Sequence, residues 1–562
     1  MINSKKRKFL STLAILAVAA TATLGGLSLV SGNPVPDVIA NADSTIVNKT
    51  SEEEATKYYV GTPEEGAAQT GTSEDDPMSP DLFQSKLVDL KPGDIVYILP
   101  GIHVANSTWA IGRMSDSETT GKYVSGSYDD YIVFKALDPT KDTGLSFYNQ
   151  SFGSTNRGVH IYGDYYYWSG IDVCGAGDNG LYIGGNYNVV ENCEFYDNRD
   201  TGLQLGRNYS SNGTINTWPN YNLVRNCTSH NNYDNETKGE NADGFAAKLT
   251  VGYHNVFDGC IAYRNSDDGW DLYGKDDTGI IGTVYMYNCV AFENGFLEYT
   301  QKECNDKYLN VLESALETNQ NTYMTANGDG NGFKLGGSTL EGDVFVYNCY
   351  AFNNRMHGIT DNSNPGVISL TNVTSYNNSA IIDNTPGSET FGQVTGCDTE
   401  HNNIDMARSE SSYNNFTGVL SVFNGRSGSG NDAYLGSAEN SLLVAGNKWN
   451  KIEDAYDANS ITGRNGQSVD SVAAENIFAA LPANNLGVDR ELDIHTAWRN
   501  ADGSINMGDI LKIKDYSVLG FAEGEIGANL SLTSQDGYTL PDYTFLTGEE
   551  SETEAKAQAI YD

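Results

Sequence analysis

Short apolar stretches alternate with corners rich in Asn and Gly along most of this 562-residue chain. One pattern, apolar-x-Asn-Cys-x-small-aromatic-x-Asn, recurs with substitutions at residues 189–198, 223–232, 256–265, 285–294, 345–354 and 369–378. Alternation with a period of two predicts short β-strands. Self-similarity at a spacing of roughly 22–34 residues predicts a solenoid of stacked units.

A second motif, Gly-apolar-x-apolar, alternates with the first and begins at Gly180, Gly202, Gly244, Gly269, Gly332 and, in degenerate form, Gly358. The next such Gly follows 9 residues after Cys193, Cys260 and Cys349, whereas 8 extra residues follow Cys227 and 34 extra follow Cys289. Fixed spacing with insertions at one place is typical of a coil whose loops leave at one corner. We therefore predict an all-β fold, a parallel β-helix with terminal caps and loop insertions. The spacing of leucine-rich repeats and the long four-strand blades of propellers are absent.

Equivalent residues of neighbouring coils should lie about 4.8 Å apart and form columns. The Asn that closes each repeat predicts an internal amide ladder, made of Asn198, Asn232, Asn265, Asn294, Asn354 and Asn378. The Cys residues of the repeat are interpreted as small buried side chains. Stacked Cys can reach bonding distance, so disulfides are the less favoured alternative.

The rest of the chain suggests end regions. We expect residues 43–150 to form an N-terminal cap and the first coils, residues 151–440 the central β-helix, and residues 441–548 the last coils and a C-terminal cap. Acidic residues 549–562 predict a frayed tail. Residues 1–42 have the order of a secretory signal peptide: a basic start, an apolar run over residues 9–30, and Ala40-Asn41-Ala42 before Asp43. An uncleaved membrane anchor is the alternative for this run.

The charge balance limits the partners. The chain has 34 Lys and Arg against 74 Asp and Glu, a formal net charge of −40. Repulsion argues against nucleic acid and against an anionic membrane surface as partners. We expect a secreted, extracellular monomer that has no membrane contact once the signal is cleaved.

Candidate chemistry gathers beside the Gly motifs. The residue two positions after Gly should point outward, and this column reads Tyr182, Gln204, Ala246, Asp271, Lys334 and Thr360. Asp243 and Asp268 stand directly before Gly, and Asp267 precedes Asp268. Four carboxylates from two neighbouring coils need a counter-cation, and hard oxygen ligands in an irregular arrangement favour Ca²⁺. The alternative is that Asp is simply a good turn residue.

Lys334 should stand one coil beyond Asp271 if the 34-residue insertion loops out. A positive ion nearby would lower the pKa of this lysine and make it a usable base. A solvated surface charge is the alternative for a lone lysine on a strand.

Residues 241–248, 265–272 and 330–337 resemble the motifs of the family 9 polysaccharide lyases, which are secreted pectate lyases. The resemblance covers residues 57–440 and, more weakly, residues 499–504. It implies a right-handed parallel β-helix in which Ca²⁺ is bound by Asp243, Asp267, Asp268 and Asp271, with Lys334 as the base. The implied reaction is β-elimination on polygalacturonate (pectin): the lysine removes the C5 proton and an unsaturated uronide is released. A lysine base predicts an alkaline optimum.

Several points stay open at this stage. The insert at residues 298–325 departs from the family pattern; it brings Lys302 and Lys307, of which Lys307 competes for the role of base, and it leaves endo or exo cleavage undecided. Lys248 and Arg355 are candidates for binding substrate carboxylates, with ordinary surface charge as the alternative. Two other functions remain: a non-catalytic Ca²⁺-binding β-helix adhesin, and a lyase or epimerase for another uronate polymer.

Overall fold

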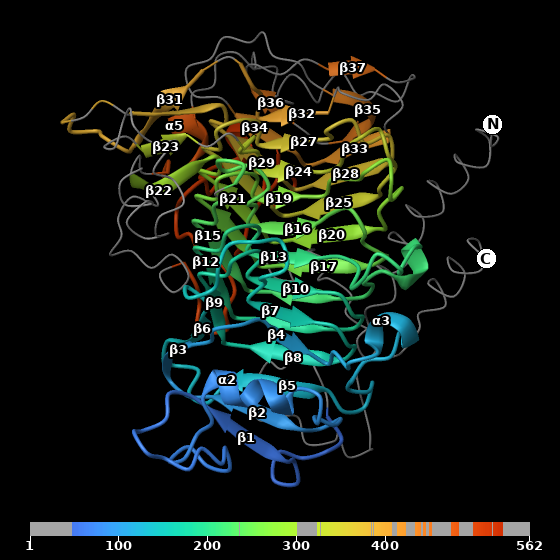
Figure 1. The fold of residues 1–562 in the computed structure, drawn as a ribbon. Coiled ribbons are helices and arrows are strands. Elements are labelled where there is room, and N and C mark those ends of the chain that lie inside the picture. The colour runs from blue at the N-terminus through green and yellow to red at the C-terminus, as the bar shows by residue number, and fades with distance from the viewer. Residues whose placement is uncertain are drawn as a thin grey trace, which may run out of the picture.

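In a computed structural model, the chain is described over residues 48–234, 236–300, 323–325, 328–383, 385, 387–398, 400–406, 413–422, 433–439, 442–444, 449–451, 474–482, 498–519 and 521–531. The strands lie one above another in a single stack of coils, with the N-terminal strands at one end (Figure 1). The predicted signal peptide at 1–42, the acidic tail at 549–562, Lys302 and Lys307 lie outside the described residues.

Three long sheets form the sides of the stack. Sheet A contains, in order, β1 (Lys57–Val60), β2 (Ile95–Ile98), β5 (Ile132–Ala136), β8 (Tyr166–Ser169), β11 (Val189–Glu191), β14 (Leu223–Arg225), β17 (Asn255–Asp258), β20 (Val284–Tyr287), β25 (Val344–Tyr347), β28 (Val367–Thr371), β33 (Tyr413–Thr417), β35 (Ala433–Glu439) and β37 (Trp449–Lys451). Sheet B contains β3 (Gly101–Val104), β6 (Thr143–Ser146), β9 (Asp172–Cys174), β12 (Glu194–Tyr196), β15 (Thr228–His230), β18 (Ile261–Tyr263), β21 (Val290–Phe292), β26 (Tyr350–Phe352), β29 (Thr374–Tyr376), β34 (Leu420–Val422) and β36 (Leu442–Val444). Sheet C contains β4 (Trp109–Ile111), β7 (Val159–Ile161), β10 (Leu181–Ile183), β13 (Leu203–Leu205), β16 (Phe245–Ala247), β19 (Trp270–Asp271), β24 (Phe333–Lys334), β27 (Ile359–Thr360) and β32 (Ile404–Asp405).

Each coil visits the three sheets in turn, as β8, β9 and β10 do. Each strand pairs in parallel with the equivalent strand of the next coil: Leu181 lies opposite Leu203, and Leu203 opposite Phe245. This topology confirms the predicted all-β parallel β-helix, because hydrogen bonds run between coils and leave every strand short.

The Asn before each Cys makes the corner between sheets A and B. Asn192, Asn226, Asn288 and Asn348 have φ values of 55°, 52°, 54° and 54°, and Gly259 takes the same place with φ 62°. Asn and Gly tolerate this left-handed conformation better than other residues. The repeated Asn-Cys pair therefore encodes a turn followed by an inward side chain.

The predicted amide ladder is present and runs one coil further, to Asn403. Each Asn donates its Nδ2 to the Oδ1 of the next, over 2.8–3.0 Å, along Asn198, Asn232, Asn265, Asn294, Asn354, Asn378 and Asn403. A second amide column, absent from the sequence prediction, includes Asn222, which donates to Asn255 over 3.0 Å. Buried amides thus satisfy one another at two corners of the coil.

The amide ladder also explains the Gly column. A Cβ added at Gly269 would lie 2.6 Å from the Gly332 carbonyl oxygen and 2.8 Å from Asn294 Nδ2. A side chain would collide with both backbone and ladder, so Gly is required where the chain enters sheet C.

The interior is apolar. Trp270 is fully buried between Phe245 and Phe333, with ring centroids 5.0 and 4.7 Å away. The five repeat Cys residues are completely buried and form no disulfide, which confirms them as small core side chains.

Two antiparallel hairpins leave the coils. One joins β22 (Phe296–Thr300) to β23 (Tyr323–Thr325), and the other joins β30 (Ala380–Ile382) to β31 (Val394–Cys397). Phe296 packs with Ala380, Ile382 and Val394, so the two hairpins share one small apolar cluster.

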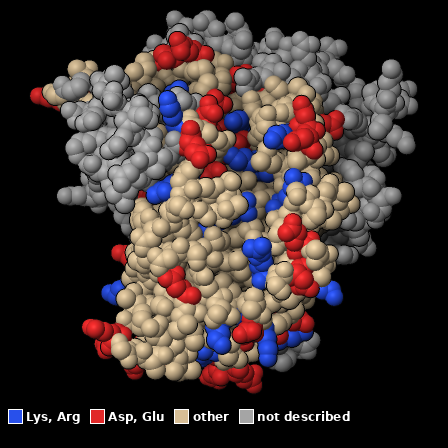
Figure 2. Space-filling model, viewed as in Figure 1, with Lys and Arg blue, Asp and Glu red and all other residues tan. Residues whose placement is uncertain are grey.

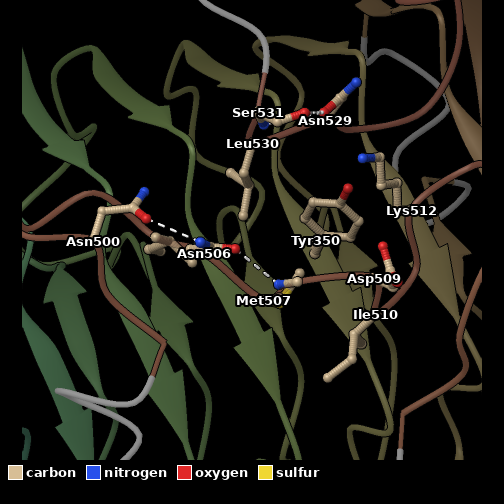
Figure 3. Close-up of a pocket in the computed structure, with 12 residues that line it drawn as sticks. Tyr350, Asn500, Asn506, Met507, Asp509, Ile510, Lys512, Asn529, Leu530 and Ser531 are labelled. Carbon is tan, nitrogen blue, oxygen red and sulfur yellow. Dashed lines mark hydrogen bonds between the residues drawn. The ribbon is translucent and has the colours of Figure 1, made fainter.

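Residues 474–482, 498–519 and 521–531 pack along sheet B. Arg499 donates to the carbonyl oxygens of Gly259 and Cys227 over 2.6 and 3.0 Å. A pocket of about 260 Å³ lies between this segment and Tyr350 of β26, lined also by Asn500 and Leu530 (Figure 3). The predicted boundaries of the two end regions stay predictions.

The helices of the described part are short: α2 (Pro80–Phe83), η1 (Gln84–Lys86), α3 (Ser117–Thr120), η2 (Ile215–Thr217), α5 (Ala474–Ile477) and α7 (Tyr516–Leu519). Within the described residues, no helix has the length and apolar character needed to cross a membrane.

Candidate active site

The predicted outward column exists on sheet C. Tyr182 pairs with Gln204, Gln204 with Ala246, Ala246 with Asp271, and Asp271 with Lys334. The long insertion therefore leaves the register of sheet C unchanged. Lys334 and Asp271 are neighbours on adjacent strands, as the sequence predicted.

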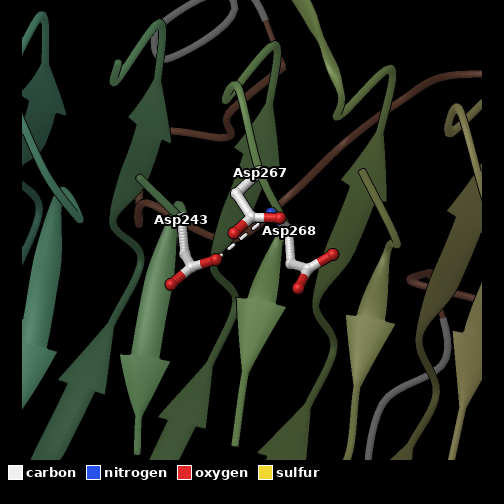
Figure 4. A group of neighbouring side chains, drawn as sticks. All are labelled: Asp243, Asp267 and Asp268. Atoms are coloured by element: carbon white, nitrogen blue, oxygen red, sulfur yellow. Dashed lines mark hydrogen bonds between the residues drawn. The ribbon is translucent and has the colours of Figure 1, made fainter. Parts of the chain in front are cut away.

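Three aspartates converge at the ends of sheet C strands. Asp243 precedes β16, and Asp267 and Asp268 precede β19 (Figure 4). One carboxylate oxygen from each lies within 4.8 Å of the others, and all three residues are buried. Asp271, the fourth predicted ligand, is adjacent but is not part of this group of three.

Backbone N–H groups fix the three carboxylates. Asp243 Oδ1 accepts from the backbone N–H of Asp268 over 3.2 Å (Figure 4). Asp267 accepts from the N–H groups of Asn241 and Asp329 over 2.8 and 2.7 Å. The aspartates are therefore held in position before any ligand binds.

Asn331 fixes Asp268 in the same way. Its backbone N–H and its Nδ2 both donate to Asp268 Oδ1, over 2.7 and 2.8 Å. The other oxygen, Oδ2, is buried, accepts no well-aligned hydrogen bond, and lies 3.0 Å from the Lys334 ammonium. This oxygen is open to a further cationic partner.

Lys334 projects into the carboxylate group. Its Nζ lies 3.0 Å from Asp268, 3.5 Å from Asp329 and 3.9 Å from Asp271, and its side chain is 12% exposed. Burial works to lower its pKa, but the surrounding carboxylates outweigh burial and raise the pKa well above the ordinary lysine value. Without a cation among the aspartates, Lys334 is held as the ammonium.

Lys248 is a buried member of the same cluster. Its Nζ lies 2.5 Å from Asp243 and 3.3 Å from Asp271. Burial opposes the charge of Lys248, yet these carboxylates raise its pKa above the usual value. The alternative of an ordinary surface charge is therefore wrong for Lys248.

The aspartates repel one another. Burial, and then the neighbouring carboxylates, raise the pKa of Asp243, Asp267 and Asp268 above the usual aspartate value, although Lys248 and Lys334 counteract this. A divalent cation would relieve both effects.

The donor set fits a hard cation. It consists of carboxylate oxygens only, at an irregular geometry, with one buried oxygen that has no hydrogen bond. Oxygen ligands of this kind suit Ca²⁺. Asp243, Asp267 and Asp268 can hold such an ion, and Asp271 can join them by leaving its lysine partners.

Two further residues border the site. Arg355 is partly buried and donates from Nη1 to the Gly328 carbonyl oxygen over 2.7 Å, and burial lowers its pKa while the carboxylate of Asp329 opposes this. Asp329 was not predicted from the sequence. Its position directly before Gly330-Asn331-Gly332, in the Lys334 motif, is the signal that could have identified it.

Known proteins resemble this chain over most of its length. Residues 58–403 match the family described as Pel9A-like, right handed beta helix region. Pectate lyase L of Paenibacillus polymyxa (strain SC2) is 35% identical over 449 residues, which cover 79% of this chain and 80% of that protein. Pectate lyase L of Dickeya dadantii (strain 3937) is 30% identical over 326 residues, which cover 57% and 65%.

Solved structures share the architecture. The crystal structure of pectate lyase Pel9A aligns with a TM-score of 0.53 and 25% identity, covering 84% of this chain and 90% of that one. A rhamnogalacturonan lyase aligns with a TM-score of 0.54 and 22% identity, covering 84% and 100%, and shares the fold.

Proposed function

This chain belongs to the Pel9A-like right-handed β-helix family, and we propose that it is a secreted pectate lyase that cleaves polygalacturonate by Ca²⁺-assisted β-elimination. Relatives named as pectate lyases support the reaction class. The observation that carries the mechanism is the register of sheet C, which sets Lys334 beside Asp271 and a cluster of three buried aspartates.

Asp243, Asp267, Asp268 and Asp271 are the residues that would hold Ca²⁺. A bound Ca²⁺ supplies positive charge to the uronate carboxylate, which makes the C5 proton more acidic. The same charge explains how a protein with a net charge of −40 can hold an anionic polymer.

Lys334 is the proposed base. In its neutral form it takes the C5 proton of the uronate, the C4–O4 glycosidic bond breaks, and a C4–C5 double bond forms without consumption of water. The departing oxygen takes a proton from solvent and Nζ returns the C5 proton to solvent, so the protons balance. Because the carboxylates raise the pKa of Lys334, only neutralisation of those carboxylates and a high pH yield the free amine.

Lys248 and Arg355 have supporting roles in this proposal. The Lys248 ammonium is paired with Asp243 and Asp271, so it orients two ligands and neutralises part of their charge. Arg355 is a partly exposed residue at the edge of the same site, where it can meet a substrate carboxylate.

The test measures unsaturated product by ultraviolet absorbance, from polygalacturonate, with Ca²⁺ and with chelator. Wild type should form product only with Ca²⁺, at a rate that rises with pH, and Lys334→Ala should lose at least about 10³-fold in kcat. Lys275→Ala is the matched control, because Lys275 follows β19 on the same coil, pairs with Asp277 at 3.7 Å and is 56% exposed. It should retain wild-type activity.

Other outcomes select other functions. Ca²⁺-dependent product that survives Lys334→Ala moves the base to another residue, and Lys307→Ala then tests the competing lysine. Ca²⁺ binding without product from pectate or alginate supports the adhesin. Unsaturated product from alginate alone supports a lyase for another uronate, and a changed ratio of uronate epimers without unsaturated product supports an epimerase.

A further inference from the structure

An arginine-rich cluster lies on sheet C, apart from the aspartates and towards the N-terminal end of the stack. His160 of β7 pairs with Tyr182 of β10 in the outward column that later carries Asp271 and Lys334. Tyr182 precedes Asp271 by three coils, a separation of about 14 Å at the usual strand spacing. The cluster and the candidate active site therefore share one face.

Arg157 is stacked on an aromatic ring at this place. Its guanidinium carbon lies 3.4 Å from the ring centroid of Tyr182, and its Nη1 lies 3.1 Å from His160 Nδ1. Its Nε lies 3.4 Å from Asp178 without a well-aligned hydrogen bond, and the side chain is 22% exposed. Stacking fixes the plane of the guanidinium, whose Nη1 and Nε face His160 and Asp178.

Arg113 is a second arginine, held by two tyrosines. Its guanidinium carbon lies 5.7 Å from the Tyr162 centroid and 6.0 Å from the Tyr209 centroid, and Nε donates to the Tyr209 hydroxyl over 3.1 Å. The Arg113 side chain is exposed. Tyr162 stacks on His160, with centroids 3.6 Å apart, which links both arginines to one aromatic floor.

Arg207 completes the cluster beside the same floor. Tyr182 donates its hydroxyl to the Arg207 carbonyl oxygen over 3.2 Å, and the charges of Arg157 and Arg207 both act on Tyr182. Arg207 is partly exposed. Three arginines therefore surround one column of the sheet in a chain of net charge −40.

The carboxylates around the cluster are already engaged. Asp178 is buried between Arg157 and Asp200, and Asp164 is partly buried and accepts from the backbone N–H of Asn186 over 2.6 Å. Lys and Arg side chains recur from lower to upper coils along the middle of the viewed face (Figure 2). A ligand with several carboxylates in sequence would complement this row.

We propose that Arg113, Arg157 and Arg207 form an extended carboxylate-binding surface that holds polyuronate several residues away from the bond that is cleaved. The assignment rests on the proposed function for the identity of the polymer. Every residue of a polyuronate carries a carboxylate, and the planar guanidinium matches its two oxygens. Ring-stacked arginines lose little conformational freedom on binding, so they strengthen the grip on a long chain.

The first test compares substrates of different length. Arg113→Ala, Arg157→Ala and Arg207→Ala, singly and together, are assayed on polygalacturonate and on trigalacturonate. The triple variant should raise KM for the polymer about tenfold or more, with a much smaller change in kcat, and should alter KM for the trimer less than twofold. Lys141→Ala, at an exposed lysine before β6, is the control.

The second test does not depend on catalysis. Affinity electrophoresis through polygalacturonate in chelator, with each arginine change placed in Lys334→Ala, should show retardation that the triple variant loses. Arg157→Lys keeps the charge but lacks the planar fork, and it should bind more weakly than Arg157. Thermal unfolding of each variant separates lost binding from lost folding.

The outcomes separate the two proposals. Arginine-dependent retardation, together with a wild-type protein that forms no unsaturated product, supports the binding surface and overturns the lyase mechanism. The binding surface is overturned, and the lyase stays intact, if product depends on Lys334 but the folded arginine variants, including exposed Arg113→Ala, keep the wild-type KM for the polymer. Equal effects on polymer and trimer also overturn it, because a distant site must depend on chain length.

Discussion

Two columns of polar side chains run along the same solenoid, and they differ in whether their side chains satisfy one another's hydrogen bonds. In the amide column, each side chain from Asn198 to Asn378 donates its Nδ2 to the Oδ1 of the next over 2.8–3.0 Å, and the last Oδ1 is that of Asn403. In the carboxylate column, Asp243 accepts from the Asp268 backbone and Asp268 accepts from the Asn331 backbone. Both columns use Oδ1 to accept a backbone N–H from a neighbouring coil, which is the preceding coil in the amide column and the following coil in the carboxylate column.

The difference lies in the second polar atom. An amide supplies an NH₂ group, so a stack of amides satisfies itself and needs nothing from outside. A carboxylate supplies another acceptor, so burial and then the repulsion between stacked aspartates raise their pKa values. A backbone N–H bonded to Oδ1 thus supports a structural ladder at one corner and a group of negative charges at another. Lys248, Lys334 and the proposed Ca²⁺ neutralise that charge.

The largest effect should come from changing a carboxylate into an amide. Asp268→Asn keeps the acceptor for Asn331 but places an NH₂ group towards the Lys334 ammonium, 3.0 Å from the present oxygen. We expect at least a thousandfold loss of kcat/KM, about 4 kcal/mol, and loss of Ca²⁺ binding. Product absorbance and calorimetric Ca²⁺ titration measure the two losses. Wild-type Ca²⁺ affinity in this variant would contradict the assignment of Asp268.

The reverse change should damage the fold. Asn294 donates Nδ2 to Asn354 Oδ1 over 2.9 Å and to the Ala262 carbonyl over 3.1 Å. Asn294→Asp replaces that donor with an acceptor facing two acceptors, so the free energy of unfolding should fall by about 3 kcal/mol. Denaturant titration checks this. Asn149→Asp, at an exposed amide, should change stability little.

A second pair of stacked acids offers a test by pH. Burial, and then the Asp200 carboxylate, raise the pKa of Asp178 to about 7, although Arg157 opposes this. The folded pKa exceeds the unfolded value, so the stabilisation from the protonated group is present at low pH and is lost as pH rises towards and through 7. Between pH 5 and pH 8, in chelator, wild type should lose about 2 kcal/mol more stability than Asp178→Asn. Parallel unfolding free energies across this range would contradict the raised pKa.

The sequence predicted the columns well because the repeat fixes the register. The Cys-to-Gly spacing set Asp271 opposite Lys334 even though a long insertion separates them, since an insertion at a corner leaves strand pairing unchanged. The amide ladder and the buried Cys residues followed from the same repeat. A pattern of period two decides which side of a strand a residue faces.

The partners that long Lys and Arg side chains contact could not be predicted from the sequence. Lys248 follows β16, and nothing in its spacing shows that it turns onto Asp243 rather than into solvent. Arg157 stacks on Tyr182 and Arg113 lies over Tyr162 of another coil. Arg499 donates to the carbonyl oxygen of Gly259, which is far away in the sequence. These contacts depend on rotamers and on loops whose paths the repeat does not specify.

The smallest predicted effect concerns the junction where the carboxylate column returns to amides. Asn331 gives two donors to Asp268 Oδ1 and also accepts from the backbone N–H of His357 through Oδ1 over 3.1 Å. Asn331→Ala removes the Nδ2 donor but keeps the backbone donor, so Asp268 stays in place with less restraint. We expect Ca²⁺ affinity to fall about tenfold, about 1.4 kcal/mol, while kcat at saturating Ca²⁺ stays within a few-fold of wild type. Calorimetric Ca²⁺ titration measures the affinity. Asn331→Asp adds a carboxylate but also lacks the Nδ2 donor, so it should not restore the orientation of Asp268. An unchanged Ca²⁺ affinity in Asn331→Ala would mean that the backbone N–H alone orients Asp268. The two columns would then differ only in the second polar atom of each side chain, Nδ2 in the amides and Oδ2 in the carboxylates.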